Sequence, residues 1–381
     1  MMESSRQKRK REKSITTPDG PLKQLDIINK DQTVFSTLPN EVILHMFSYL
    51  KIVDLQKCGQ VSKRFRAISN DDQYLWPKKV NISFKKVPVG FLQRLLDSGC
   101  KYLSLSGAFL EGTLNLPKAS RLKYLNYSGG FDHVENSEKL LESSYSLEKL
   151  SLSNLHLSSK LISIISLQNG KTLTVVDLSQ CNLCIKNYNC VSYPTVHCDY
   201  SLSIQQFVEN CTELKELSLY MTKLCENSVD ILLSNLTSTI EKLDLFDMTF
   251  LRDDHVKKLV TRCNKITELN LGGQLTSITK QSLNFIFEHL QLTLEKLYMR
   301  FTNAKFNAYY DLLKLKSMIK LTLFSYIMSY GDYRFLKKEL PNLWIHSEPG
   351  IKTIAIPCLP NQFSQRFWEI EAEREELFSS L

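Results

Sequence analysis

A short leucine pattern recurs through residues 100–346 and constrains the fold more than any other feature of the chain. The unit is Leu-x-x-Leu-x-Leu, with another apolar residue in place of leucine in some copies. Successive copies are 22 to 28 residues apart, except for one gap of 41. Alternate residues of a strand point to the same side, so the pattern predicts ten short strands that present the same apolar face. Their central residues are Leu103, Leu125, Leu150, Val176, Leu217, Leu243, Leu269, Leu297, Leu321 and Leu343.

The intervals between the predicted strands are long enough to hold one helix each. Apolar residues at helical spacing occur within residues 228–233, 254–263 and 281–289. One strand and one helix per repeat is typical of a leucine-rich-repeat solenoid, in which parallel strands form the concave face and helices the convex face. The expected fold class of this part is therefore α/β.

The gap of 41 residues contains an insertion at residues 180–200. Its potential metal ligands are Cys181, Cys184, Cys190, His197 and Cys198. Zinc sites use thiolates at such spacings. Cys181, however, falls where a leucine-rich repeat places a buried Asn or Cys after the strand, and Cys211 and Cys263 recur six residues before a central leucine. We interpret the insertion as a surface loop and assign no metal, with a zinc site as the less favoured alternative.

Residues 34–80 show a different pattern, that of two or three short helices. The sequence runs Leu38-Pro39-x-Glu41-Val42-Ile43-Leu44-x-x-Phe47-x-x-Leu50, then Asp54-Leu55, Val61-Ser62-Lys63-Arg64-Phe65 and Leu75-Trp76. Fewer than about 50 residues cannot bury all of their apolar surface, so such a module has area left for docking. The ordered set resembles an F-box from end to end. The resemblance implies binding to the Skp adaptor, and through it to a cullin, by Leu38, Pro39, Ile43, Leu44, Phe47, Leu50, Leu55 and Trp76.

The flanking segments are assigned by composition. Residues 1–33 are polar and contain a basic run, which predicts a disordered tail with an import signal at Lys8, Arg9, Lys10 and Arg11. Residues 81–99 connect the helical module to the repeats. Residues 347–381 form a C-terminal tail, part of which we expect to fold back on the concave face. The expected location is the nucleus and the cytoplasm.

No pattern in the sequence indicates catalysis. There is no Gly-x-Ser-x-Gly and no phosphate-binding glycine loop, and outside the insertion no histidine has an acid or cysteine at catalytic or metal-binding spacing. The net charge of +8 is small for a dedicated nucleic-acid binder. No apolar run reaches the ~18 residues that span a bilayer. We expect a protein that is not an enzyme and has no cofactor and no nucleic-acid or membrane partner.

A solenoid without an active site offers its concave wall as a binding surface. The residues between the core leucines are small and polar in the first four strands, and most of them are serine. From the fifth strand onward they become aromatic and charged, which are the types that anchor protein interfaces. If the substrate is phosphorylated, the basic residues among them are the candidate phosphate partners. The predicted substrate residues are Tyr220, Lys242, Phe246, Lys296, Tyr298, Arg300, Phe324 and Trp344.

The whole arrangement resembles the family of the S-phase kinase-associated F-box protein, within the F-box/leucine-rich-repeat proteins. Besides the F-box, Phe335-Leu-Lys-Lys-Glu-Leu-Pro341-x-Leu343-x-Ile345 and Lys352-Thr-Ile-Ala-x-Pro357 with Trp368 carry the resemblance. It implies an SCF-type ubiquitin-ligase subunit that binds phosphorylated cell-cycle regulators, such as cyclin-dependent kinase inhibitors, together with a small cyclin-kinase-subunit accessory protein. The alternative is a scaffold or nuclear docking protein that uses the same F-box without directing degradation.

Overall fold

The computed structural model describes residues 35, 37–50, 52–69, 80–82, 86–97, 99–116, 120–129, 134–183, 200–273, 277–300, 313–315, 317–324 and 330–345. The chain divides into two compact units between Leu75 and Trp76. The predicted import signal, the C-terminal tail, Trp76 and most of the insertion lie outside the described residues. Within the described residues, no helix is long and apolar enough to cross a membrane.

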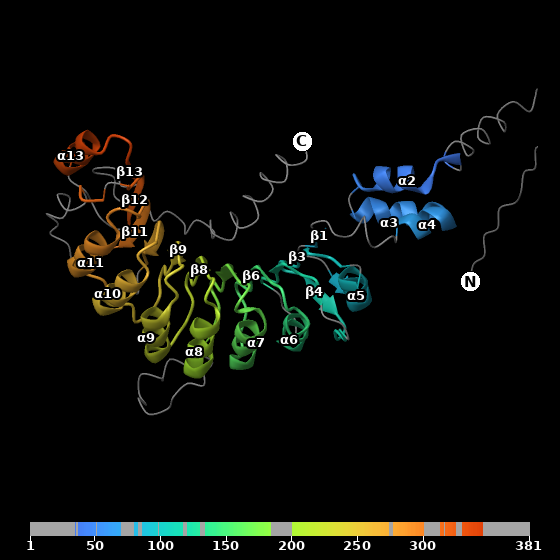
Figure 1. The fold of residues 1–381 in the computed structure, drawn as a ribbon, viewed down its shortest axis with the longest axis horizontal. Coiled ribbons are helices and arrows are strands. Elements are labelled where there is room, and N and C mark those ends of the chain that lie inside the picture. The colour runs from blue at the N-terminus through green and yellow to red at the C-terminus, as the bar shows by residue number, and fades with distance from the viewer. Residues whose placement is uncertain are drawn as a thin grey trace, which may run out of the picture. The chain divides into compact units, whose positions relative to one another are not determined.

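The first unit consists of helices α2 (Asn40–Phe47), α3 (Ile52–Val61) and α4 (Lys63–Ser69) (Figure 1). Pro39 precedes α2, where its missing N–H costs nothing, and its carbonyl accepts a hydrogen bond from the Ile43 N–H at 3.2 Å. Gly59 lets α3 and α4 pack closely, because a Cβ at this position would lie 2.8 Å from Ser69 Oγ. The interior of the unit is apolar, with Ile43, Phe47, Leu55 and Ile68 buried.

The second unit is built on one parallel sheet of eleven strands, whose order is β1-β3-β5-β6-β7-β8-β9-β10-β11-β12-β13. The strands are β1 (Val80–Asn81), β3 (Tyr102–Ser104), β5 (Tyr124–Asn126), β6 (Lys149–Ser151), β7 (Val175–Asp177), β8 (Glu216–Ser218), β9 (Lys242–Asp244), β10 (Glu268–Leu271), β11 (Lys296–Arg300), β12 (Lys320–Phe324) and β13 (Trp344–Ile345). A second, two-stranded parallel sheet pairs β2 (Lys86–Pro88) with β4 (Phe109–Glu111).

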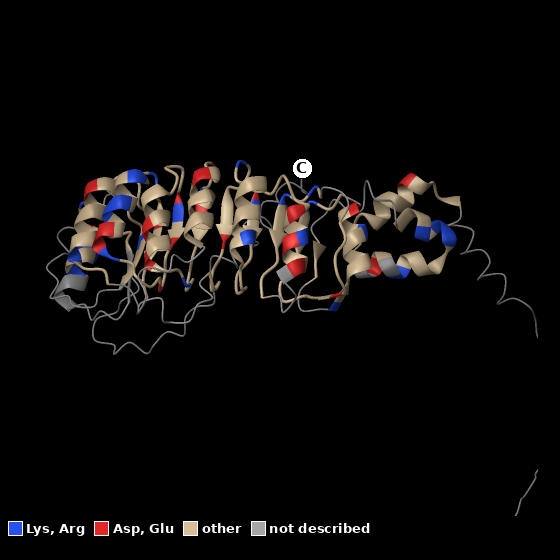
Figure 2. Ribbon diagram, turned by 90° about the horizontal axis from the view of Figure 1, so that it is seen from below, with Lys and Arg blue, Asp and Glu red and all other residues tan. Residues whose placement is uncertain are grey.

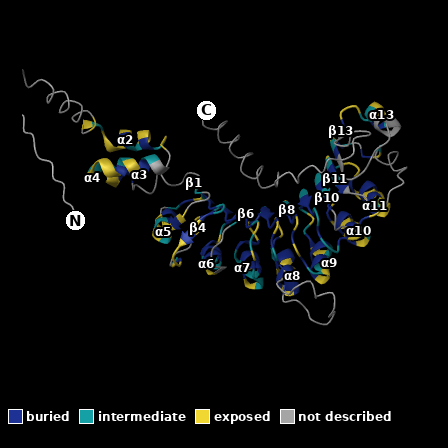
Figure 3. Cartoon of the chain, turned by 180° about the vertical axis from the view of Figure 1, so that it is seen from behind, coloured by how far each residue is buried: buried dark blue, intermediate teal, exposed yellow. Residues whose placement is uncertain are grey.

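Helices connect the strands and lie on one side of the sheet (Figure 1). They are α5 (Val89–Asp97), α6 (Val134–Glu142), α7 (Ser159–Asn169), α8 (Tyr200–Asn210), α9 (Glu226–Asn235), α10 (Asp253–Arg262), α11 (Lys280–Leu290) and α13 (Tyr330–Glu339). The central residues of β3 and β5–β11 are at most 1% exposed, because each packs against the helix of its own repeat and the leucines of its neighbours (Figure 3). The predicted α/β solenoid of strand-plus-helix repeats is confirmed.

The two ends of the sheet differ from the sequence prediction. Residue Leu321 of β12 pairs with Ile345 and not with Leu343, so the last strand begins two residues later than the leucine spacing predicts. Leu343 is instead a buried turn residue, whose N–H donates to the Leu340 carbonyl at 3.0 Å. At the other end of the sheet β1 adds an eleventh strand. The sequence prediction assigned Val80 to the helical module and Asn81 to the connecting segment. The predicted domain boundaries stay predictions.

A residue in the left-handed backbone region follows each of seven strands, four positions after the central residue. At this point the chain leaves the sheet, and Gly and Asn adopt the required positive φ most easily. At Gly273 the turn is also tight, since a Cβ would lie 2.4 Å from the Asp247 backbone. The seven residues are Gly107, Gly129, Asn154, Gln180, Met221, Asp247 and Gly273.

Candidate functional site

Helix α2 of the first unit is apolar on two sides, and the unit buries only one of them. Ile43 and Phe47 face the interior and are 1% and 5% exposed. Val42 and Met46, at the neighbouring helical positions, keep 42% and 45% of their surface exposed. Contiguous exposed apolar side chains mark a protein-binding surface. We name this surface the α2 face and define it as Val42, Met46, Tyr49 and Leu50.

Three of the predicted adaptor residues are buried in the first unit, and their role in adaptor binding stays a prediction. Ile43, Phe47 and Leu55 lie in the core of the unit, where they are at most 5% exposed. Phe47 packs there edge-to-face against Phe65, with ring centroids 5.3 Å apart. Leu38 and Leu44 are half-buried, while Pro39 and Leu50 are exposed.

Arg64 connects α4 to the start of α2. Its guanidinium donates to Asn40 Oδ1 at 2.9 Å, to the Phe35 carbonyl at 3.2 Å and to the Leu38 carbonyl. Two of the acceptors are backbone carbonyls of the segment before α2, and the third is the side chain of Asn40, the first residue of α2. The Lys-Arg-Phe part of the sequence motif therefore fixes the direction in which the Leu38-Pro39 segment enters α2.

The sequence interpretation missed Val42, Met46 and Tyr49. They follow one another at spacings of four and three, which places them on one helical stripe beside that of Ile43 and Phe47. A helix with two apolar stripes needs two neighbours. That signal was present in the sequence, but it does not say which stripe the module itself covers.

The predicted substrate residues come from the strands of the second unit. Tyr220 and Phe246, which follow β8 and β9, stack with ring centroids 4.8 Å apart and an interplanar angle of 13°. Tyr220 is only 7% exposed, while Phe246 is half-buried, and their role as substrate anchors stays a prediction. Each ring covers its neighbour along the sheet, and this accounts for the burial.

The lysines predicted to meet a phosphate already have carboxylate partners. Lys242 Nζ lies 2.6 Å from Glu216 Oε1, and Lys296 Nζ lies 3.1 Å from Glu268 Oε2. The register explains both pairs, because Glu216 is aligned with Lys242 on the neighbouring strand and Glu268 with Lys296. Each lysine thus has a carboxylate partner, and its role as a phosphate partner stays a prediction.

The remaining predicted substrate residues lie near the C-terminal end of the sheet. Tyr298 is half-buried beneath Lys320, whose Nζ is 5.0 Å from the ring centroid. The register aligns Arg300 with Phe324 and Lys320 with Trp344. The side chains of Arg300, Phe324 and Trp344 lie outside the described residues, so their role stays a prediction.

The serine-rich wall of the early repeats is held by internal hydrogen bonds. Ser151 Oγ donates to Asp177 Oδ2 at 2.9 Å, and the Ser179 N–H donates to Asp177 Oδ1 at the same distance. Burial raises the pKa of Asp177 despite these bonds. Burial likewise raises the pKa of Asp244 to about 7, although the Phe246 N–H donates to its carboxylate at 2.9 Å.

The raised pKa of Asp244 predicts a pH-dependent stability. The folded chain holds this proton up to about pH 7, whereas an unfolded aspartate loses it near pH 4, so the stabilisation is complete below pH 4 and is lost as the pH rises to 7. Asp244→Asn removes this titration. We expect the variant to have a higher Tm than the parent at pH 8, with the difference shrinking toward pH 5. Thermal unfolding of both proteins across this range checks it; a constant difference would contradict it.

Four of the described cysteines are buried core residues of the repeats. Cys100, Cys181, Cys211 and Cys263 are buried, and burial raises their pKa values to about 11 for Cys100 and about 12 for the other three. Cys181 Sγ donates to the Leu152 carbonyl at 3.1 Å, as a neutral thiol does. No group of potential metal ligands occurs among the described residues. The other four potential ligands of the insertion lie outside them.

Comparisons with known proteins assign both units. A family model described as F-box-like matches residues 35–81, and one described as SKP2 LRR domain matches residues 90–375. Among solved structures, the chain is similar to an internalin from Listeria monocytogenes, with 12% sequence identity and a TM-score of 0.37, over 77% of this chain and 93% of that chain.

A helical module with an apolar docking face, followed by a strand-and-helix solenoid, defines an F-box/leucine-rich-repeat protein, and this class supplies the substrate receptors of SCF-type ubiquitin ligases. The SKP2 LRR model matches residues 90–375, which is more than half of this chain, so the chain belongs to the SKP2-type family. The F-box implies binding to a Skp1-type adaptor, and the repeats imply binding to a protein substrate. Such families are typically non-catalytic receptors.

Proposed function

We propose that this chain presents phosphorylated cell-cycle regulators, such as cyclin-dependent kinase inhibitors, to an SCF-type ligase for ubiquitination and proteasomal degradation. The observation that carries the proposal is the match of residues 90–375 to the SKP2 LRR domain, directly after an F-box. The substrate class comes from the family resemblance.

The receptor contributes no reacting group in this function. The α2 face binds the adaptor and the repeats bind the substrate, so both proteins are held on one chain. Tethering raises the effective concentration of substrate lysines near the charged conjugating enzyme, and this proximity accelerates the transfer. The chemistry itself belongs to the other subunits of the ligase.

The pairing of the lysines bears on how a phosphate is bound. Glu216 and Glu268 already occupy Lys242 and Lys296, so a phosphate on the substrate would have to displace a carboxylate from each pair. Arg300, at the end of β11, is the predicted partner that remains. The family resemblance also implies a small cyclin-kinase-subunit accessory protein, and we include it in the proposal.

The proposal places the protein in the nucleus and the cytoplasm. Lys8, Arg9, Lys10 and Arg11 would act as the import signal. Replacing the four basic residues by alanine in a fluorescent fusion should shift the protein to the cytoplasm; an unchanged distribution would contradict this part.

Affinity capture from cells tests the proposed function. The full chain is captured with and without a proteasome inhibitor, and one half of each sample is treated with phosphatase before capture. A substrate should accumulate at least several-fold when degradation is blocked and disappear after phosphatase treatment. Partners whose amounts do not respond to the proteasome inhibitor would instead support the non-degradative scaffold.

A further inference from the structure

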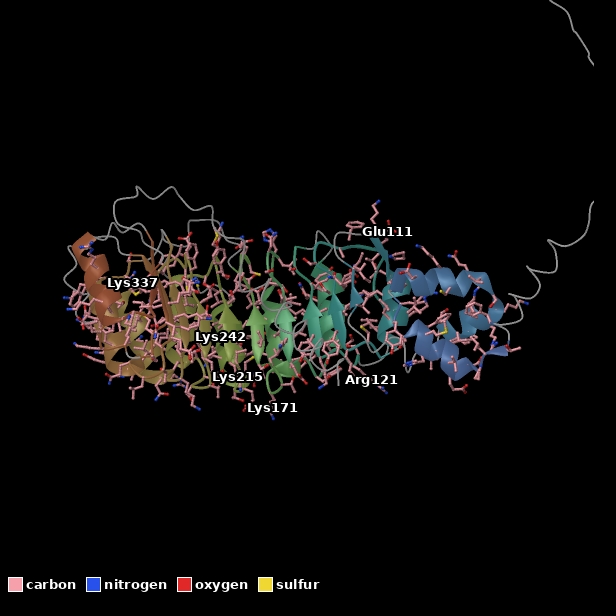
Figure 4. The ribbon with its side chains drawn as sticks, turned by 90° about the horizontal axis from the view of Figure 1, so that it is seen from above. Glu111, Arg121, Lys171, Lys215, Lys242 and Lys337 are labelled. Carbon is pink, nitrogen blue, oxygen red and sulfur yellow. The ribbon has the colours of Figure 1, made fainter. Side chains whose placement is uncertain are left out.

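The edge of the sheet at which strands β3, β5, β6 and β7 begin is rich in positive charge. We name it the first-repeat edge. Its described basic residues are Lys101, Arg121, Lys123, Lys149 and Lys171. The acidic residues near them are Glu148 and Asp97. Glu148, just before β6, forms an ion pair with Lys123 at 2.5 Å, and Asp97 is the last residue of α5. Figure 4 shows Arg121 and Lys171 along this edge and Glu111 on the opposite side.

The charge excess is local to these repeats. The helices together carry both acidic and basic residues (Figure 2), and the lysines of α6 and α7 are paired with carboxylates. Lys139 lies 2.8 Å from Glu135, and Lys160 lies 2.7 Å from Glu138. Farther along the same edge the charges also balance, since Lys215 lies 3.5 Å from Glu241 and Glu213 lies two residues before Lys215 in the sequence.

The first-repeat edge also carries an ordered aromatic surface. Tyr102 and Tyr124 begin β3 and β5 and stack with ring centroids 4.5 Å apart and an interplanar angle of 14°. Lys149, which begins β6, places its Nζ 5.1 Å from the Tyr124 ring centroid. All three side chains are half-buried. A preformed row of this kind offers contact area at low entropic cost, so it suits binding.

We propose that the first-repeat edge is a second docking site, which binds an acidic segment of a protein substrate. The proposal deepens the receptor function and rests on it. Four neighbouring strands span roughly 14 Å, which is the length of about four or five extended residues. Acidic side chains of such a segment pair with Lys101, Arg121 and Lys171, while its apolar atoms lie on Tyr102 and Tyr124. A nucleic acid is the poorer occupant, because its binding sites are longer basic stripes.

Charge reversal in the full chain tests the site. The probe is a fluorescein-labelled octaglutamate peptide, with octaglutamine as the neutral comparison, and binding is followed by fluorescence anisotropy. The variant Lys101→Glu/Arg121→Glu should weaken octaglutamate binding about tenfold or more, because each reversal removes one ion pair and adds a repulsion. Binding to the parent should also weaken as salt rises from 50 to 300 mM.

A matched control uses the same two repeat positions in the balanced part of the edge. Lys215 precedes its central leucine by two residues, as Lys101 does, and Lys265 precedes its own by four, as Arg121 does. Lys215→Glu/Lys265→Glu should stay within about twofold of the parent. Equal losses in both double variants would show that only overall charge matters and would overturn the proposal, as would a parent that does not bind octaglutamate.

Two further outcomes would assign the edge to another occupant. The chain has five glutamates at residues 369–376; if changing them to glutamine raises octaglutamate affinity fivefold or more, the chain's own end occupies the edge. If a labelled single-stranded DNA 8-mer binds more tightly than octaglutamate at 150 mM salt, the site is for nucleic acid. These measurements use no adaptor and no ubiquitination, so a negative result would overturn the second docking site without bearing on the receptor function. A negative result in the capture experiment would likewise bear on the receptor function and not on octaglutamate binding.

Discussion

Replacing Val42 and Met46 together by aspartate is expected to abolish co-purification of the Skp1-type adaptor while the first unit stays folded. Both side chains are more than 40% exposed, so the change leaves the interior between Ile43 and Phe47 untouched. Each of the two side chains is already more than half covered, so covering the rest with a partner is worth about 1–3 kcal/mol for the pair, and buried charges would oppose contact further. The affinity should therefore fall by about 10²-fold or more, which calorimetric titration with the purified adaptor measures.

A control with the same charge change lies elsewhere on the module. Gln60→Asp/Ala67→Asp also adds two negative charges at exposed positions, on α3 and α4. This variant should retain more of the adaptor affinity than the α2 variant, and both should keep the parent's far-ultraviolet circular dichroism. Adaptor binding that survives the α2 substitutions at full strength would show that the α2 face is not the adaptor surface.

The fold of the second unit could be predicted from the sequence to the level of single strands. A core leucine is required in each repeat because the solenoid stacks the same layer again and again, so the spacing alone locates the strands. The prediction went wrong where that layer ends. Leu343 has the right spacing, yet it closes a turn and Ile345 takes its place beside Leu321. The last strand, β13, pairs with a neighbour on one side only. Its position along the sequence is therefore less strictly determined by the repeat spacing.

The binding surfaces were predicted less well, for two physical reasons. Periodicity shows that Ile43 and Phe47 share a helical face, but not whether the module or its partner covers that face. Charge pairing depends on the register between strands, and Glu216 and Lys242 are separated by 26 residues in the sequence. The sequence therefore showed the lysines without the carboxylates that compensate them.

The same limit explains why the aromatic row of the early repeats was missed. Tyr102 and Tyr124 precede the central leucines, and only the register shows that they stack with each other and align with Lys149. The sequence interpretation considered the small polar residues, mostly serines, that follow the central leucines of the early repeats, and it predicted the substrate residues in the later repeats. In the structure those serines are hydrogen-bonded internally, and the surface with binding character lies at the other end of the same strands.

Gly273→Ala is expected to destabilise the second unit by about 4 kcal/mol or more. Gly273 has φ +111°, which L side chains rarely adopt, and an added Cβ would lie 2.4 Å from both the Cα and the N of Asp247. These are backbone atoms of the neighbouring turn, so relief requires the turns after β9 and β10 to separate. Thermal and chemical unfolding of the parent and the variant measure the loss.

Gly90→Ala is the matched control, because it adds the same methyl group to the same unit. A Cβ at Gly90 would meet nothing within 4 Å, and the residue lies in α5, where alanine is preferred over glycine by about 1 kcal/mol. This variant should be as stable as the parent or slightly more stable. Since each repeat packs only on its neighbours, the damage at Gly273 should be local: amide exchange should rise in β9–β11 and stay slow in β3–β6. A uniform rise across the sheet would contradict this explanation, because it would mean that the turn at Gly273 supports the whole solenoid.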